Sequence, residues 1–239
     1  MSRMRLRPAC SQDLPSIADL AAQAMLEDEL FTHLCPHRYE HYPSFRYGFL
    51  RRLKKRLVTP GHVMMVAVEN GTLGAGELIR GYAVWERIGK VGVPQLNDTW
   101  GNGEDTFASA LERKLLALED RYLALVSPDC SVDQHRLEHY TAVAVDCFPF
   151  SEFPDIWFLT TLAVDPKFQR RGIGQQLVQW GMEQALHENV PLGLEASAKG
   201  IGLYERLGFR TVNTTELIPG ITIQAMLCNS KSLSDNMHD

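Results

Sequence analysis

The chain has 239 residues, 45% of them hydrophobic, and a formal net charge of -5 at pH 7. This length can bury a sizeable core, and the mildly acidic balance argues against a nucleic-acid binder. No apolar run reaches the roughly eighteen residues of a membrane span, and Met1–Pro8 lacks the apolar segment of a secretory signal. The five scattered cysteines favour reduced thiols in the cytoplasm, with the nucleus as an alternative. We expect no nucleic acid or membrane as partner, and a monomer or homodimer.

The chain up to Ile88 has the pattern of strands and helices joined by short turns. Apolar residues spaced at about 3.6 positions favour a helix over 13–25, and Asn70-Gly71 is a turn signal. Three strands are expected in this part, at 5–8, 62–68 and 81–88.

The segment from Arg46 to Arg56 is strongly basic, with six Lys or Arg residues and no acid. Apolar residues recur every four positions from Phe45 to Leu57, which predicts an amphipathic helix with an apolar inner face. The favoured interpretation is a solvated basic face. A patch for nuclear targeting or for an acidic partner is the alternative.

Histidines just before this helix raise the question of a metal site. His33, His37 and His41, with Cys35 between them, are residue types that bind zinc. Pro36 breaks any continuous helix that would align them, and no second cysteine pair completes a site. We expect no metal here or elsewhere in the chain.

An insertion of about 92–150 separates the third strand from the next apolar run. Helical spacing is present over 105–126, and Ser131 with Gln134 resembles a capping box that starts another helix ending near Val143. Long structureless loops are uncommon in compact domains, so we expect this insertion to be helical.

A buried strand is expected at Ile156–Val164, which is rich in β-forming residues and stops at Asp165-Pro166. Helical spacing begins again at Gly172 and continues to about Asn189. The chain therefore passes from strand to helix through a short loop.

That loop is basic and contains glycine. Gly172 and Gly174 lack Cβ, so the N–H groups of the loop and of the first helical turn can approach an anion closely. Arg170 and Arg171 add positive charge that the helix N-terminus alone would not supply. The segment therefore predicts a site for a phosphorylated cofactor.

Two familiar phosphate-binding loops do not fit the spacing. A Walker A loop needs Lys-Ser/Thr after its last glycine, and none follows Gly174. A dinucleotide fingerprint needs a third glycine, where this chain has Leu177.

The C-terminal part contains a second pattern. Residues 192–197 are expected to form a short strand, and residues 199–209 a helix stopped by glycine. Two terminal strands are expected at 210–217 and 221–227, followed by a polar tail at about 229–239.

Two motifs in order carry a family resemblance. The first is Leu162-Ala-Val-Asp-Pro166 followed by Gln169-Arg-Arg-Gly-Ile-Gly174, and the second is Leu203-Tyr-Glu-Arg-Leu-Gly-Phe209. Together they resemble the GNAT superfamily of N-acetyltransferases. The resemblance implies one mixed α+β domain over 1–239, with a mostly antiparallel sheet splayed between its fourth and fifth strands and flanked by helices. The helical insertion would precede the fourth strand. It is a candidate for a wall on the acceptor side, and the alternative is a helical layer that only covers the sheet.

The resemblance also implies acetyl-coenzyme A as acetyl donor. Its pantetheine arm would pair with the main chain of the fourth strand, and its pyrophosphate would lie in the loop. The implied cofactor-binding residues are Leu162, Ala163, Val164, Gln169, Arg170, Arg171, Gly172, Ile173, Gly174, Gln175 and Ser197.

Tyr204 is the implied catalytic residue, as proton donor to the leaving thiolate. A tyrosine titrates near ~10 and a thiol near ~8.5, so this transfer is only mildly uphill. Many relatives place a base where this chain has Phe158 and Thr160, neither of which accepts a proton near neutral pH. Glu195, Asp155, Glu152 and a water chain remain as alternatives, and the base is left unassigned.

The resulting hypothesis is an acetyltransferase that passes an acetyl group to the primary amine of a small molecule, by direct attack in a ternary complex. Two alternatives stay open. One is a protein or peptide N-acetyltransferase, and the other is a non-catalytic module that binds acyl-coenzyme A.

Overall fold

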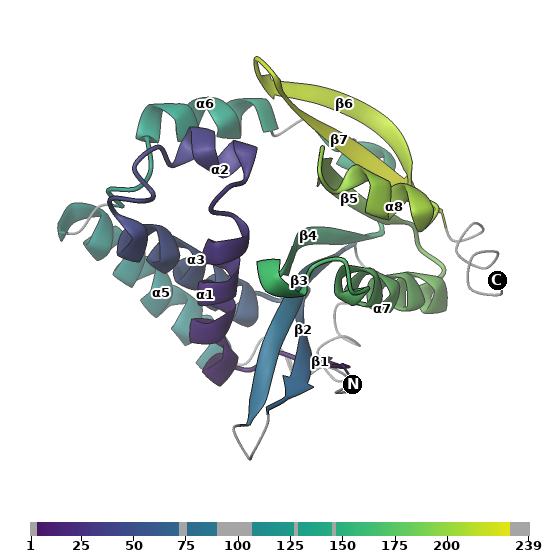
Figure 1. The fold of residues 1–239 in the computed structure, drawn as a ribbon, viewed down its shortest axis with the longest axis horizontal. Coiled ribbons are helices and arrows are strands. Elements are labelled where there is room, and N and C mark those ends of the chain that lie inside the picture. Colours follow the sequence, from purple (N-terminus) through teal and green to yellow (C-terminus); the bar gives the residue numbers. More distant parts are fainter. Residues whose placement is uncertain (1–3, 72–75, 90–106, 127–128, 145–146, 230–239) are drawn as a thin grey trace.

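The computed structural model describes residues 4–71, 76–89, 107–126, 129–144 and 147–229. Figure 1 shows one sheet with helices on both faces. The strands are β1 (Arg5–Pro8), β2 (His62–Asn70), β3 (Glu77–Ile88), β4 (Ile156–Val164), β5 (Leu192–Ser197), β6 (Arg210–Ile218) and β7 (Ile221–Cys228). The α-helices are α1 (Leu14–Ala24), α2 (Glu29–Leu34), α3 (Tyr42–Val58), α5 (Phe107–Val126), α6 (Gln134–Ala144), α7 (Ile173–Glu188) and α8 (Ile201–Arg206).

The seven strands form one sheet in the order β1-β2-β3-β4-β5-β7-β6. Neighbouring strands are antiparallel except β4 and β5, which are parallel and pair only from Trp157 with Leu192 to Leu159 with Leu194. From Thr160 onward, β4 pairs with β3 alone. The mixed α+β class and the splay between the fourth and fifth strands are therefore confirmed.

β4 carries a bulge at the point where this splay begins. Val84 of β3 lies opposite Thr161, but the next residue, Trp85, lies opposite Leu159, so Thr160 is the extra residue. The Thr160 hydroxyl donates to the carbonyl oxygen of Val84 at 3.1 Å. Bulges redirect side chains and often lie beside active sites.

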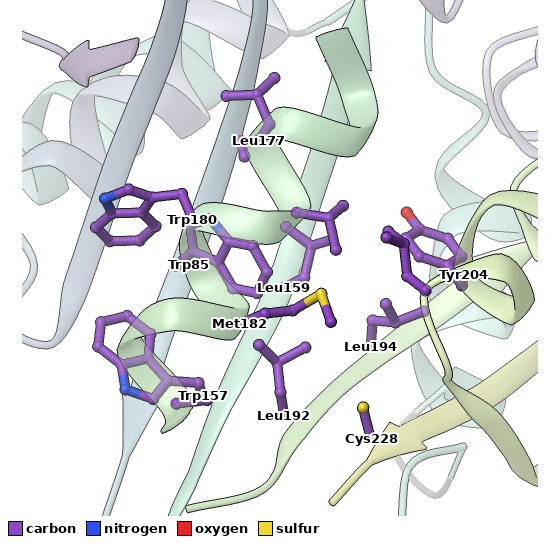
Figure 2. Packing of buried hydrophobic residues seen from close by; sticks show 14 of the residues in the cluster. Trp85, Trp157, Leu159, Leu177, Trp180, Met182, Leu192, Leu194, Tyr204 and Cys228 are labelled. Atoms are coloured by element: carbon purple, nitrogen blue, oxygen red, sulfur yellow. The ribbon is translucent and has the colours of Figure 1, made fainter. Parts of the chain in front are cut away.

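The two faces of the sheet have separate cores. On one face, α7 and α8 cover a cluster built around three tryptophans, Trp85, Trp157 and Trp180, which Figure 2 shows beside Leu177 and Leu192. On the other face, α1 and α3 cover residues that alternate with these, among them Tyr82, Val84 and Ala163. This alternation follows from the period of two along each strand.

The tryptophan cluster depends on one close contact of α7. A Cβ added at Gly181 would lie 2.4 Å from two ring carbons of Trp85, which is fully buried. We expect Gly181→Ala to lower the free energy of unfolding by about 1–3 kcal/mol, because overpacking a dense core forces strain. Urea denaturation measures this change. Gly202→Ala in α8 is the matched control, since its nearest contact is an Arg206 nitrogen at 3.6 Å. An equal effect of both substitutions would refute the contact.

The predicted elements agree with the structure in place and type, except for the capping box predicted in the insertion. In α5, three leucines of the apolar stripe, Leu111, Leu115 and Leu118, are 46%, 56% and 59% exposed. The start of α6 is capped by Asp133, whose carboxylate accepts from Arg136 N–H at 3.1 Å, and Ser131 instead donates to Asp129.

Parts of two predicted segments lie outside the described residues, namely 90–106 of the insertion region and 230–239 of the tail. Where the structure describes the chain, none of its helices is long and apolar enough to cross a membrane.

Candidate functional site

From Thr160 onward, one edge of β4 has unpaired main-chain groups, because β5 no longer pairs with it. Asp165 N–H donates to Arg80 O of β3 at 2.9 Å. Because main-chain groups of a strand alternate in direction, those of Val164 and Leu162 turn toward the open side. Gln169 Nε2 donates to Val164 O at 3.3 Å from that side. Of the three strand residues predicted to bind cofactor, the geometry thus favours Leu162 and Val164, whereas Ala163 pairs with Tyr82 and is buried.

The loop after β4 has a backbone suited to an anion. Arg170 and Gly172 both have positive φ, 62° and 80°, and Gly172 leads directly into α7. The first N–H groups of α7, from Ile173 onward, have no partner within the helix. The loop residues 169–172 are exposed, so an anion can reach these donors.

One of the two arginines of the loop, Arg171, is held by contacts within the loop. The Arg171 guanidinium lies 4.7 Å above the Phe168 ring, and one of its nitrogens donates to Lys167 O at 3.4 Å. In the part of the chain that the structure describes, neither Arg170 nor Arg171 is paired with a carboxylate. Their charge is therefore available to a ligand.

Gly174 joins the loop to the rest of the site. A Cβ at Gly174 would lie 3.5 to 3.8 Å from side chains of Leu203, Val164 and Leu162. The first turn of α7 therefore lies against both the open part of β4 and the helix that carries Tyr204. Gln175 follows in the same turn and is exposed.

Tyr204 lies in α8 and is 7% exposed. Its ring packs against Phe209, with ring centroids 5.8 Å apart, and Figure 2 places it at the edge of the cluster beside Leu194. Burial raises its pKa above the usual 10. The phenol therefore stays protonated through the physiological range and can act only as a proton donor there. Ser197, the last residue of β5, is exposed, and its carbonyl accepts from Gly200 N–H just before α8.

Glu195 is the first residue of β5 after the pairing with β4 ends. Its neighbours Leu194 and Ala196 belong to the tryptophan cluster, so the Glu195 side chain points to the opposite face. There the thiol of Cys147 donates a hydrogen bond to the carboxylate. Burial raises the pKa of Glu195 above its usual 4.5, as expected for a carboxylate with little water around it.

The other acids considered from the sequence lie away from the splay. Asp155 precedes β4 at its paired end and forms an ion pair with Arg87 at 3.6 Å. Glu152 lies in an exposed turn before it. Phe158 is buried among aromatic rings, and Thr160 is the bulge residue. Among these candidates, only Glu195 is at the open part of the sheet.

Sequence reasoning missed a contact between α3 and β4. Arg56 Nη1 donates to Thr161 Oγ1 at 2.5 Å, on the face opposite α7. The basic run gave a signal, since Arg52 and Arg56 are one helical turn apart. The difference between these two arginines and the other bases of the run becomes apparent only from the positions of α1 and α5, whose acids pair with the other bases.

The fold and this arrangement define a class: mixed α+β proteins in which an open strand edge leads into an anion-binding loop at a helix N-terminus. A family model described as "Acetyltransferase (GNAT) domain" matches residues 135–211, from α6 to the start of β6. A protein of Stachybotrys chartarum named acetyltransferase is 27% identical over 214 residues, which cover 87% of this chain and 80% of that protein.

Solved structures agree at the level of the fold. A Corynebacterium glutamicum protein described as a histone acetyltransferase and related acetyltransferase superposes with a TM-score of 0.57 at 21% identity, over 95% of this chain and 96% of its own. A putative GNAT acetyltransferase from Desulfovibrio desulfuricans superposes with a TM-score of 0.52 at 13% identity, over 95% and 99%. Residues 135–211, which contain both motifs, match the GNAT acetyltransferase domain, as the motifs predicted, and the chain shares its fold with these solved structures over 95% of its length.

Proposed function

We propose that this acetyltransferase uses acetyl-coenzyme A to acetylate the primary amine of a small molecule, by direct attack in a ternary complex. The carrying observation is the convergence of three features at one end of β4. These are its unpaired edge, the loop whose two arginines pair with no carboxylate among the described residues, and the buried phenol of Tyr204. We further propose one domain over 1–239, because β1 and β7 belong to the same sheet.

The cofactor would lie along this edge. Its pyrophosphate accepts from the N–H groups at the start of α7 and from Arg170 and Arg171, and its amide-containing arm pairs with Leu162 and Val164. The thioester then lies near the bulge, where an N–H group at Leu162 can donate to the carbonyl oxygen as it becomes negative.

The chemical step moves one acetyl group and two protons. The nitrogen lone pair of the acceptor attacks the thioester carbonyl carbon, a C–N bond forms, and the C–S bond breaks. Tyr204 gives its proton to the departing thiolate, and the ammonium proton of the acceptor passes to Glu195. Exchange with solvent then returns a proton to Tyr204 and removes one from Glu195. Glu195 supplies the base that the sequence left open, and its presence at the splay opposes the reading as a non-catalytic module.

An acceptor screen tests this function. The purified protein is incubated with acetyl-coenzyme A and a panel of small primary amines, amino acids, and peptides that include histone tails. Thiol release and mass spectrometry are read together. Acetylation of small amines supports the proposal, and labelling of peptides alone would replace it with a protein acetyltransferase. Tight cofactor binding by calorimetry, with no thiol release for any acceptor, would instead support a binding module.

The loop assignment has its own test. Replacing both Arg170 and Arg171 with alanine should raise the Michaelis constant for acetyl-coenzyme A by about tenfold or more, since each charge-assisted bond to phosphate is worth about 1.5–3 kcal/mol. The Michaelis constant for the acceptor should change little. Arg121→Ala on the exposed part of α5 is the control. If the cofactor constant of the double variant equals that of the control, the phosphates bind elsewhere.

A further inference from the structure

The basic face of α3 divides into two groups in the structure. Four of the six bases between Arg46 and Arg56 form ion pairs with acids of neighbouring helices. Arg46 pairs with Asp19 of α1, Lys54 with Glu119 of α5 at 3.9 Å, and Arg51 and Lys55 both with Asp120 of α5. These four bases attach α3 to its neighbours and need no further partner.

Arg52 and Arg56 are the remaining two, one turn apart. Arg56 donates to Thr161 Oγ1, and the Arg52 guanidinium lies 4.5 Å above the Phe49 ring. Within the described residues, neither one forms an ion pair. The Arg52 side chain still reaches solvent, yet the elements packed around it lower its pKa, as burial also does for Arg56. Arg56 is only partly exposed, and a guanidinium with little water and no counterion is unfavourable unless an anion joins it.

Two acids, Glu86 and Asp129, lie near this pair, but neither forms an ion pair with Arg52 or Arg56 within the described residues. Asp129 lies near Arg52 beside Gly48 of α3, since a Cβ on Gly48 would lie 3.1 Å from Asp129 Oδ2 and 3.7 Å from an Arg52 nitrogen. The other Asp129 oxygen accepts from both the N–H and the hydroxyl of Ser131, at 3.0 and 2.5 Å. No ion pair forms between Asp129 and Arg52 in the described structure.

Arg52 and Arg56 lie close to the place where the reacting centre is expected. Thr161 adjoins Leu162 on the open part of β4, and its hydroxyl donates to Thr160 O at the bulge. Arg56 is thus one residue away from the expected place of the thioester. It lies on the same face as Glu195, which β5 presents across the splay. A ligand on this face would meet a carboxylate on one side and two guanidiniums on the other.

We propose that Arg52 and Arg56 bind an anionic group of the acceptor, so that the substrate is a small amine that also carries a carboxylate or a phosphate. This inference rests on the proposed acetyl transfer. The amine lies toward Glu195 and the anion toward Arg56, whose planar guanidinium suits both kinds of oxyanion. The same contact orients the nitrogen toward the carbonyl carbon.

Matched acceptors test the inference. Amino acids are compared with their amides, and ethanolamine with its phosphate ester, which separates carboxylate from phosphate. The anionic member of at least one pair should have a kcat/KM about tenfold or more above its neutral partner, as for one charge-assisted hydrogen bond. Arg56→Gln and Arg52→Gln should remove this preference, and Arg56→Lys should restore part of it. Arg51→Gln, which changes a paired base of the same helix, should keep it.

A binding measurement separates failure of the inference from failure of the proposed function. Two bisubstrate analogues join coenzyme A through an acetyl linker to an amine that bears either a carboxylate or a carboxamide. Calorimetry should show the carboxylate analogue binding about tenfold more tightly to the wild type and equally to Arg56→Gln. Equal affinity in the wild type, equal turnover of neutral and anionic acceptors, or a preference for acidic peptides would overturn the inference. If no acceptor releases thiol, the proposed function itself fails.

Discussion

Replacing Tyr204 with phenylalanine should lower kcat by about a hundredfold or more, the range typical of a positioned general acid. The thiolate would then leave without a proton from the protein. The Michaelis constant for acetyl-coenzyme A should stay near that of the wild type, because the ring and its packing against Phe209 are kept. Since burial holds the pKa of Tyr204 above 10, the wild type should also show no loss of activity from its ionisation up to about pH 10.

The control is Tyr122→Phe, the same chemical change on α5, where the side chain is 65% exposed. Rapid-quench kinetics should be used, so that the chemical step is observed rather than product release. If the Tyr204 variant forms product as fast as this control, the thiolate takes its proton from water and Tyr204 is only a packing residue.

A second large effect is expected for Glu195→Gln. The glutamine cannot accept the proton of the ammonium, and kcat/KM near neutral pH should fall by about a hundredfold. The wild type loses activity as the pH falls through the raised pKa of Glu195, because the protonated carboxyl is no longer a base. In the variant that acidic limb should disappear, leaving only the titration of the acceptor amine. The pH profile of kcat/KM measures both effects.

Stability separates this loss of activity from misfolding. A glutamate whose pKa is raised by folding favours the folded state below its unfolded pKa, and this advantage is lost as the pH rises through the folded pKa. At neutral pH the ionised Glu195 is therefore unfavourable, and Glu195→Gln should melt at the same temperature as the wild type or higher. Glu138→Gln, at an exposed position of α6, is the kinetic control. A variant that retains the wild-type acidic limb would show that the base lies elsewhere.

The parts of the site that depend on local chemistry were predictable. Gly172 adopts the left-handed conformation that glycine favours, and it starts α7 where the change of hydrophobic period predicted a helix. Gly208, which predicted the end of α8, also has the left-handed conformation, whereas Tyr204 was singled out by the family resemblance of its motif. Such signals lie within a few residues of what they specify.

The remaining features depend on contacts between distant segments. The bulge at Thr160 depends on the register between β3 and β4, and no residue within β4 predicts it. The division of the bases on α3 needs the positions of Asp19 and Asp120, which come from two other helices. The exposed apolar stripe of α5 is another feature that could not be predicted from the local sequence. Its spacing predicted the helix, but spacing does not say whether another element covers it.

The single extra residue in β4, Thr160, determines which side chains of the strand face α7 and which face α3. In a strand with strict alternation, Leu159 and Thr161 would share a face. Because Thr160 interrupts the count, Leu159 faces α7 and Thr161 faces α3. If Thr160 took a regular place in the strand, Thr161 would face the tryptophan core and Leu162 would face Arg56. The strand therefore consists of two segments of opposite phase that meet at Thr160, one paired on both sides and the other along the open edge of the sheet.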